Sequence, residues 1–322
     1  MILYDSFNNT LLPLLRLKPL FNLRTGMLTE SQRLKLQGKE ISQIQSQRTG
    51  FLPLSELEVN IATVSAGSSV TPTDLLNNLS DNLIQDFALL KSTKKTGHIP
   101  SSVIGDSKDI YVDEGTEISP SCEFDVRNGP IFIGKSCRLG AFSVITGPAY
   151  IGSHSILDRC SFELSSAGVH SRLGGEISNS IIGDYSNKHH EGFLGHSLVG
   201  DWVNLGALTT TSDLKNNYGE IKLSFEQEQY PTGRIKLGSI IGDFSKTAIG
   251  TMLNTGTIID FGSCLFADRP HLKYYYPFFW GGHTPGKYDL ERFLADATKI
   301  MARRDQILPS ELETLIRQFY QG

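Results

Sequence analysis

The stretch IGKSCRLGAFSVITGPAYIGSHSIL, residues 133–157, decides the fold because two classes of residue recur in it with a period of six. A period of six fits neither an α-helix nor a simple alternating strand, but it is typical of repeats that stack into a solenoid. We therefore predict a three-sided parallel β-helix, with aliphatic side chains pointing inward and small ones filling the corners. The aliphatic positions are Ile133, Leu139, Ile145, Ile151 and Leu157, and the small ones are Cys137, Ser143, Ala149, Ser155 and Ser161.

The same period returns on both sides of this stretch. It is clear at Ile241, Thr247, Leu253, Ile259 and Leu265, with Ser245, Thr251, Thr257 and Ser263 as the small residues, and fainter at Val112, Ile118 and Phe124, with Thr116, Cys122 and Asn128. Interruptions are expected at 128–130, 163–171 and 211–234. The predicted class is mainly β: a parallel β-helix over 103–280, a small α/β N-terminal region over 1–95, and C-terminal helices over 281–322.

The segments outside the repeat contain ordinary helix and strand signals. A short strand is expected at 1–4, and one apolar stripe predicts a helix over 73–90, capped by Thr71 and Thr73. Residues 91–102 are polar and are typical of a linker. Six aromatic residues between 274 and 280 are expected to cap the last coil, and two amphipathic helices are expected near 290–301 and 312–319.

The composition excludes several classes of function. The chain has 322 residues, of which 39% are hydrophobic and 20% charged, and a net charge of −4. A protein that binds nucleic acid or an anionic membrane needs a concentrated basic face, so neither partner is expected. Residues 1–21 resemble neither a signal peptide nor a membrane span, which favours a cytoplasmic protein. The four cysteines form no Cys-x-x-Cys pair, and two of them, Cys122 and Cys137, occupy small corner positions of the repeat, where packing explains them without redox or metal chemistry.

The candidate chemistry lies where histidines gather. Three of the eight histidines fall in KHHEGFLGH, residues 188–196, beside VNLGA at 203–207 and shortly before the long interruption. An imidazole can accept a proton near neutral pH, and fixed backbone N–H groups can stabilise an oxyanion, so the cluster favours a general-base transfer reaction. A zinc-dependent hydratase is a rival reading, with His190 and His196 as a close pair. However, His154 and His170 do not occupy matching places in the repeat.

Several longer segments resemble one family. His190–Gly195, Val203–Thr211 and Asn217–Gly219 resemble the acetyltransferase half of the bacterial bifunctional enzyme that makes UDP-N-acetylglucosamine. Arg172–Ile177, Asn187–His190, Ser212–Tyr218 and Ile249–Gly256 resemble a related group described as sugar nucleotidyltransferases with a similar C-terminal half. The resemblance implies a left-handed coil, a homotrimer with active sites between subunits, and acetyl-CoA as the acyl donor, with no metal required.

The resemblance also assigns roles to single residues. It implies direct attack of a sugar amine on the thioester, with an amino sugar phosphate or a sugar nucleotide as acceptor. His190 matches the catalytic base, and Glu176 matches a carboxylate at the acceptor site. Asn204, Asn217 and Tyr218 match residues near the sugar, Ala207 and Thr251 match the acetyl-CoA side, and Arg172, Lys188 and Lys215 are candidates to supply positive charge.

The chain departs from the family in its pocket and at its front. Ser178 stands where the glucosamine-phosphate enzymes have a sugar-binding lysine, Phe193 replaces a tyrosine, and Leu208 replaces a glycine. Residues 11–14 and 22–29 resemble the opening of the nucleotidyltransferase domain, but about 95 residues is roughly half of a full nucleotide-binding domain. We expect no nucleotidyl transfer and a shortened remnant packed on the first coils or on a neighbouring subunit. A catalytically silent sugar-nucleotide-binding or assembly protein is the alternative.

Overall fold

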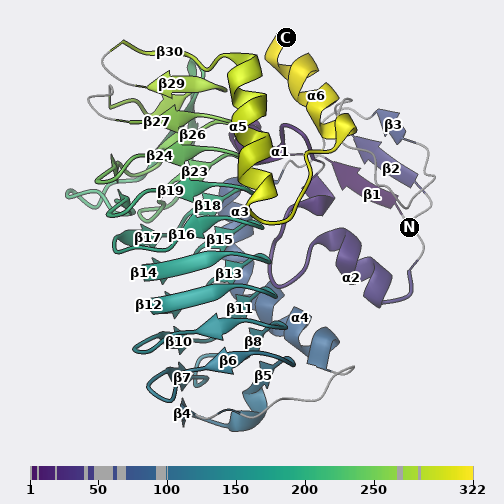
Figure 1. Ribbon diagram of the computed structural model, residues 1–322, viewed down its shortest axis with the longest axis vertical. Helices are drawn as coiled ribbons and strands as arrows, with labels where there is room; N and C mark the ends of the chain where they lie inside the picture. Colours follow the sequence, from purple (N-terminus) through teal and green to yellow (C-terminus); the bar gives the residue numbers. More distant parts are fainter. Residues whose placement is uncertain are drawn as a thin grey trace.

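The chain folds into a parallel β-solenoid of about ten turns, as the hexad pattern predicts. In the computed structural model the described residues are 2–5, 7–18, 20–39, 43–46, 61–63, 70–91, 99, 101–266, 271–281 and 284–321. Strands stack from β4 (Ser102–Ile104) at one end to β29 (Phe279–Gly281) at the other (Figure 1). The solenoid is of the left-handed type that the family resemblance implies. A 3-10 turn, η3 (Ser107–Asp109), lies in the first coil.

The strands form three faces of a prism. Face 1 is a nine-stranded sheet. Most strands of faces 2 and 3 belong to one further sheet, because two long strands, β12 (Ile156–Glu163) and β14 (Arg172–Ser178), run through the corner between these faces; β20 (Thr210–Thr211) and β25 (Met252–Leu253) on face 3 pair only with each other. Face 1 consists of β5 (Ile110–Val112), β8 (Ile131–Ile133), β11 (Ala149–Ile151), β13 (Ser166–Ala167), β15 (Ile181–Ile182), β18 (Leu198–Val199), β23 (Ile240–Ile241), β26 (Ile258–Ile259) and β28 (Tyr274–Tyr275).

Face 2 consists of β6 (Glu117–Ile118), β9 (Arg138–Leu139), the start of β12 (Ile156–Glu163), the start of β14 (Arg172–Ser178), β16 (Asn187–Lys188), β19 (Asn204–Leu205), β24 (Lys246–Thr247), β27 (Cys264–Leu265) and β29. Face 3 consists of β4, β7 (Glu123–Asp125), β10 (Val144–Thr146), the ends of β12 and β14, β17 (Phe193–Gly195), β20 (Thr210–Thr211) and β25 (Met252–Leu253). The last strand, β30 (Gly286–Lys287), pairs antiparallel with β29.

The prism interior is built by the predicted aliphatic positions. Ile133, Ile145, Ile151 and Leu157 are fully buried in one continuous core. Most of the small residues fill the corners as expected, and their hydroxyls satisfy backbone carbonyls of the next coil. Ser155 Oγ, for example, donates to Gly168 O at 3.1 Å. Apolar burial of this kind is the main driving force for stacking the coils.

The repeat slips after Leu157, and there the prediction is wrong. Ser161 was expected in a corner, but it is exposed on β12, and Cys160 and Phe162 point inward instead. Arg159 has φ +46°, and the pairing register between β12 and β14 shifts between Leu157 and Cys160. Residues 163–171 were expected to interrupt the solenoid, yet they contain β13 and continue it.

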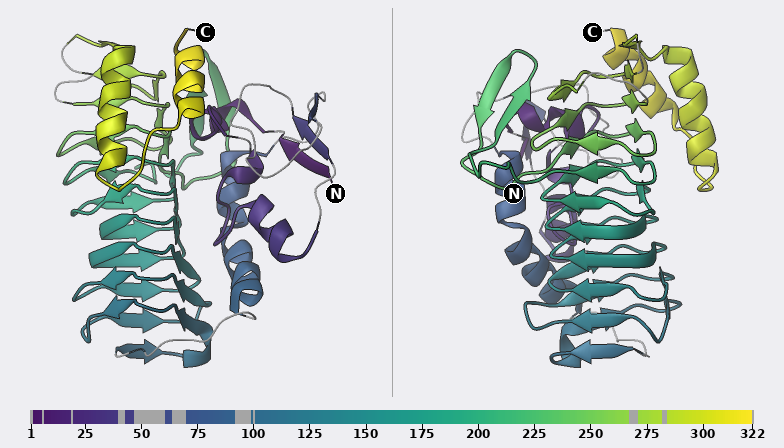
Figure 2. Two further views of the ribbon diagram at one scale, coloured as in Figure 1. Left: turned by 45° about the vertical axis from the view of Figure 1, so that its right-hand side comes forward. Right: turned by 90° about the vertical axis from the view of Figure 1, so that its left-hand side faces the viewer.

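The N-terminal region lies beside face 1 (Figure 2). It contains a parallel sheet of β1 (Ile2–Asp5), β2 (Gln43–Ser46) and β3 (Ile61–Thr63), the 3-10 turns η1 (Asn9–Leu11) and η2 (Leu20–Asn22), and the helices α1 (Leu12–Leu15), α2 (Glu30–Leu36), α3 (Pro72–Asn77) and α4 (Leu79–Lys91). The single helix predicted over 73–90 is thus two helices, separated at Asn78, with Thr71 as the N-cap. Most of the predicted linker, 92–98 and 100, lies outside the described residues.

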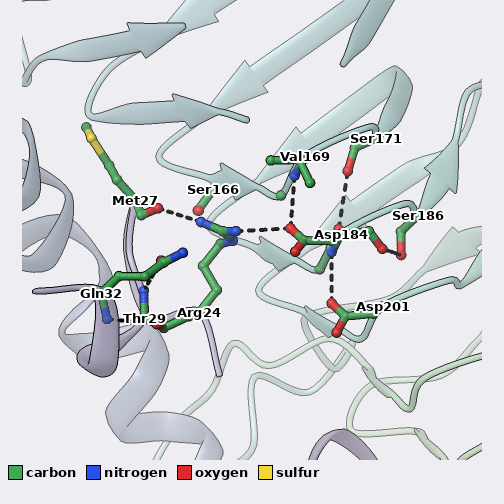
Figure 3. A network of polar contacts seen from close by, with 12 residues as sticks. Arg24, Met27, Thr29, Gln32, Ser166, Val169, Ser171, Asp184, Ser186 and Asp201 are labelled. Carbon is green, nitrogen blue, oxygen red and sulfur yellow. Dashed lines mark hydrogen bonds and ion pairs between the residues drawn. The ribbon is translucent and has the colours of Figure 1, made fainter. Parts of the chain in front are cut away.

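A column of aspartates joins this region to the solenoid. Arg24 Nη2 lies 3.0 Å from Asp184 Oδ1 (Figure 3), Lys18 Nζ lies 2.5 Å from Asp201, and Arg16 Nη2 lies 2.5 Å from Asp260. The column also binds the backbone, because Asp201 Oδ1 accepts a hydrogen bond from the Asp184 N–H at 2.8 Å. The front region therefore runs along most of face 1, and the expectation that it packs only on the first coils or a neighbour is too narrow.

The long interruption and the C-terminus cover the last coils. Residues 212–239 contain a hairpin, β21 (Lys222–Phe225) with β22 (Glu228–Pro231), whose apolar side chains join the cluster on face 1. Helices α5 (Leu290–Ala302) and α6 (Ser310–Gln321) agree with the two predicted helices. Tyr275, Phe278 and Phe279 are buried in the last coil, as the predicted cap requires.

Candidate functional site

His190 lies at the corner where face 2 turns into face 3. It lies two residues after the end of β16, and its side chain is exposed rather than turned into the solenoid. The ring of His189 meets the ring of His190 edge to face, with centroids 5.3 Å apart, and His189 Nε2 lies 3.6 Å from Asp158 Oδ2. Burial lowers the pKa of His189, and the Asp158 carboxylate opposes that shift. The corner therefore presents one exposed imidazole supported by a second.

Lys188 anchors this corner from inside. Its side chain is only 3% exposed, and its Nζ donates to Gly174 O at 3.0 Å and to His190 O. It occupies an inward position of the repeat, in register with Leu173 of the preceding coil. Burial lowers the pKa of its ammonium group to about 8. The ammonium thus contacts backbone oxygens and fixes the turn that carries His190, which is not the direct sugar contact we expected of it.

Glu176 belongs to the same corner. It lies on the face 3 part of β14, in register with Phe193 of the next coil, and its carboxylate is exposed. The Glu176 N–H donates to Gly192 O at 3.2 Å, so the turn that carries His190 rests directly against this strand. Ser178 lies on the same strand two residues further on. The structure therefore brings the two predicted catalytic residues to neighbouring coils at one corner.

A cleft of about 410 Å³ opens on face 2 and extends to Tyr185 and Trp202, at the edge of that face opposite His190. Two of the predicted residues, Arg172 and Asn204, line it, together with Asn187, whose amide donates to Asn204 Oδ1 at 2.7 Å. The remaining lining residues were missed by the sequence reasoning: Tyr185, Trp202, Val203, Lys246, Ile300, Arg303 and Arg304. The adjacent arginines at the end of an amphipathic helix were the available signal.

The other predicted residues lie elsewhere. Lys215, Asn217 and Tyr218 belong to the interruption that leaves face 3 after β20, at the opposite edge of that face from His190. Tyr218 is 69% exposed, and Asn217 Oδ1 accepts from the Gly219 N–H at 3.0 Å. Within the described residues no hydrogen bond or ion pair joins this loop to His190. One copy of the chain does not assemble the loop and the histidine corner into a single site.

Ala207 and Thr251 lie at the same corner between faces 2 and 3 as His190, in the two coils that follow it along the solenoid. Thr251 is buried and donates to Ala248 O at 2.8 Å, so it fills the solenoid corner like the other small residues. Beside them Leu208, Ile249 and Met252 are exposed. An acyl donor passing here would meet an apolar edge and the backbone rather than the Thr251 hydroxyl.

The third histidine of the cluster has a different partner. His196 Nδ1 lies 2.7 Å from Asp213 Oδ2, at the start of the long interruption, and burial lowers the pKa of this imidazole. In the parts of the chain that the structure describes, no group of three or more His, Cys, Asp or Glu side chains is arranged to hold a metal ion. Among the same residues, no helix is long and apolar enough to cross a membrane.

Sequence comparisons identify several curated proteins similar to this chain, although no family model matches it. It is 24% identical over 246 residues, 69% of this chain and 48% of the relative, to the bifunctional protein GlmU of Ralstonia nicotianae. It is 30% identical over 190 residues, 58% of this chain and 42% of the relative, to GlmU of Methanococcus aeolicus. A bifunctional sugar-1-phosphate nucleotidylyltransferase/acetyltransferase of Sulfurisphaera tokodaii is 31% identical over 84 residues, 26% of this chain and 21% of that protein.

The chain spans about half or less of the length of these curated relatives. The shared region and the solenoid agree with the resemblance seen in the histidine and loop motifs. The chain, built on a parallel β-solenoid, is accordingly similar to the GlmU and sugar-1-phosphate nucleotidylyltransferase/acetyltransferase proteins.

Proposed function

We propose that this protein is an acyl-CoA-dependent N-acyltransferase, with acetyl-CoA as donor and an amino sugar phosphate or a sugar nucleotide as acceptor. The observation that carries the proposal is the exposed His190, fixed at a rigid corner by Lys188 and adjacent to the strand of Glu176. The names of the relatives, which include a nucleotidylyltransferase/acetyltransferase, support the same reaction class.

In the proposed reaction His190 removes a proton from the acceptor nitrogen as that nitrogen attacks the thioester carbonyl. The new C–N bond forms, the C–S bond breaks, and the thiolate leaves and is protonated as free coenzyme A. The reaction needs no covalent enzyme intermediate, because a rigid corner that holds both reactants side by side supplies the orientation. Glu176 would bind hydroxyl or amine hydrogens of the sugar. Nucleotidyl transfer is not part of the proposal.

We also propose that the working unit is a homotrimer whose active sites include residues of two copies. The loop of Asn217 and Tyr218 leaves the far edge of face 3, so a second copy would be needed to bring such a loop to His190. An exposed apolar edge offers the surface for that copy, because large side chains rarely gather in contact with water without a partner. The edge is formed by Phe142, Val144, Leu208, Ile249 and Met252.

Free-thiol release tests the reaction. The purified chain is incubated with acetyl-CoA and a panel of amino sugar phosphates and sugar nucleotides, and the thiol is followed with a chromogenic reagent. We expect release with at least one acceptor and its loss by 100-fold or more in His190→Ala, since a general base contributes about 10²–10⁴-fold. His154→Ala, an exposed histidine on a different corner, is the matched control and should retain activity. Silence of the wild type across the panel would favour the silent binding protein instead.

Sedimentation tests the assembly. The wild type should sediment as a trimer, and Met252→Glu should shift it towards the monomer because a charge would be buried at the interface. Ile307→Glu changes an exposed residue in the connection between α5 and α6 and should leave the mass unchanged. A monomeric wild type, or a Met252→Glu trimer as stable as the parent, would contradict the assembly.

A further inference from the structure

Four cationic side chains line the cleft on face 2 without a carboxylate among the lining residues. They are Arg172, Lys246, Arg303 and Arg304. None of the four forms an ion pair with any residue that the structure describes, whereas Arg16, Lys18 and Arg24 each hold an aspartate of the column on face 1. Burial lowers the pKa of Arg304, and repulsion from Arg172 and Arg303 lowers that pKa further. Cations gathered without counter-charge favour an anionic ligand.

The residues around Lys246 leave its positive charge available to bind a ligand. Burial lowers the pKa of its ammonium group, which lies 5.6 Å from the ring centroid of Tyr288. Asp296 is the nearby carboxylate that opposes the shift, but it lies outside the cleft lining and accepts a hydrogen bond from the Tyr288 hydroxyl at 2.6 Å. Lys246 is therefore a partly buried cation whose neighbours do not neutralise it.

The cations are spread along the face rather than collected at one point. Arg172, Asn187, Asn204 and Lys246 follow one another in register on four successive strands. Strands in a sheet are about 4.8 Å apart, so the backbones of the first and last are separated by about 14 Å. An extended anion can lie along such an array, whereas a single phosphate would require long side chains to fold inward from both ends.

The uncharged lining favours a ligand with polar groups beyond its phosphates. Asn187 and Asn204 present amides, and Tyr185 and Trp202 stack on each other with ring centroids 4.1 Å apart. His170 covers the other face of Tyr185, and Phe244 lies beyond Trp202, so mainly ring edges remain for the cleft. A volume of about 410 Å³ lies within the range of small-molecule sites and far exceeds what one phosphate fills.

We propose that this cleft binds the diphosphate of a nucleotide ligand through Arg172, Lys246, Arg303 and Arg304. The proposal rests on the proposed function and narrows it, because it selects a nucleotide-linked sugar over a sugar monophosphate as acceptor. Asn187 precedes His190 by three residues, a span of at most about 11 Å. One sugar ring separates the diphosphate from the amine in such an acceptor, whereas the long pantetheine arm separates the diphosphate of coenzyme A from its thioester. The short span fits the acceptor.

Calorimetric titration of the full chain tests the cleft with inorganic phosphate, pyrophosphate, a uridine diphosphate hexosamine and coenzyme A. We expect the hexosamine nucleotide to bind at least 10-fold more tightly than inorganic phosphate. Arg304→Gln and Lys246→Ala should each weaken it by 10-fold or more, with thermal melts confirming that both variants fold. Lys299→Ala is the matched control, because it removes a charge from α5 outside the cleft and should leave affinity unchanged.

Each remaining outcome decides one part of the proposal. Binding of coenzyme A but not the hexosamine nucleotide, lost in the same variants, would keep the nucleoside diphosphate site and overturn its assignment to the acceptor. No binding by any diphosphate, or binding untouched by both substitutions, would overturn the site itself. Acyl transfer to a sugar monophosphate in that case would leave the proposed function standing.

Discussion

Lys188 makes a prediction whose size follows from its burial. Its ammonium group has a pKa of about 8 in the folded chain against 10.5 for a free lysine. Between these two values the unfolded chain binds more protons than the folded one, so the free energy of unfolding rises with pH. A difference of about 2.5 units corresponds to about 3 kcal/mol at 1.36 kcal/mol per unit. The burial penalty is present below pH 8 and disappears as pH rises towards 10.5.

Lys188→Met keeps the length of the side chain and removes the titration. Urea unfolding followed by circular dichroism at several pH values gives the free energy of unfolding of both proteins. The free energy of unfolding of the wild type should rise by about 3 kcal/mol relative to that of the variant between pH 8 and pH 10.5. Lys222→Met removes an exposed lysine from β21 and should leave the difference flat. A difference for Lys188→Met that stays constant within about 0.5 kcal/mol, or that changes in the opposite direction, would show that Lys188 is not a buried ammonium group with a lowered pKa.

Three further predictions concern stability and reactivity. Asp86→Ala should lower the free energy of unfolding, measured with denaturant, by about 3–5 kcal/mol, because this buried carboxylate pairs with the Arg33 guanidinium and accepts two backbone N–H groups. Gln85→Ala, at an exposed position of the same helix, should lower it by under about 0.5 kcal/mol. Leu157→Ala should cost about 2–5 kcal/mol by the same assay, against under about 0.5 kcal/mol for the exposed Ile307→Ala, and equal losses would contradict the inward assignment. A thiol reagent should modify no cysteine other than Cys264 before unfolding and all four afterwards; early reaction elsewhere would contradict the burial of the others.

The solenoid could be predicted because its signal is local. Each coil repeats the same inward and corner positions, so the period is visible in a short window. The slip at Ser161 could not be predicted, because the positive φ of Arg159 and the strand that runs through the corner appear only when neighbouring coils pair. Lys188 shows the opposite error: its position matches that of Leu173, but its charge led us to place it outside.

The candidate site was predictable only in part. The histidine corner follows from a contiguous motif, whereas the cleft joins four strands and the end of α5, which are far apart in the sequence. Arg303 and Arg304 resemble the ordinary basic last turn of a helix, and only the fold brings them opposite Lys246. The attachment of the front region could not be predicted for the same reason, because its cations pair with aspartates that lie on different coils of the solenoid.

Mass spectrometry can locate the transferred acetyl group on the acceptor and detect any acetylated protein. An amino sugar acceptor is incubated with acetyl-CoA and either wild type or His190→Ala, and both the sugar and the protein are analysed over time. We expect acetylation on the sugar nitrogen by wild type, at least a 100-fold slower rate in the variant, and no acetylated protein at any time. Equal rates in both proteins, an acetyl group on oxygen, or an acetyl-enzyme that forms before the product would contradict it.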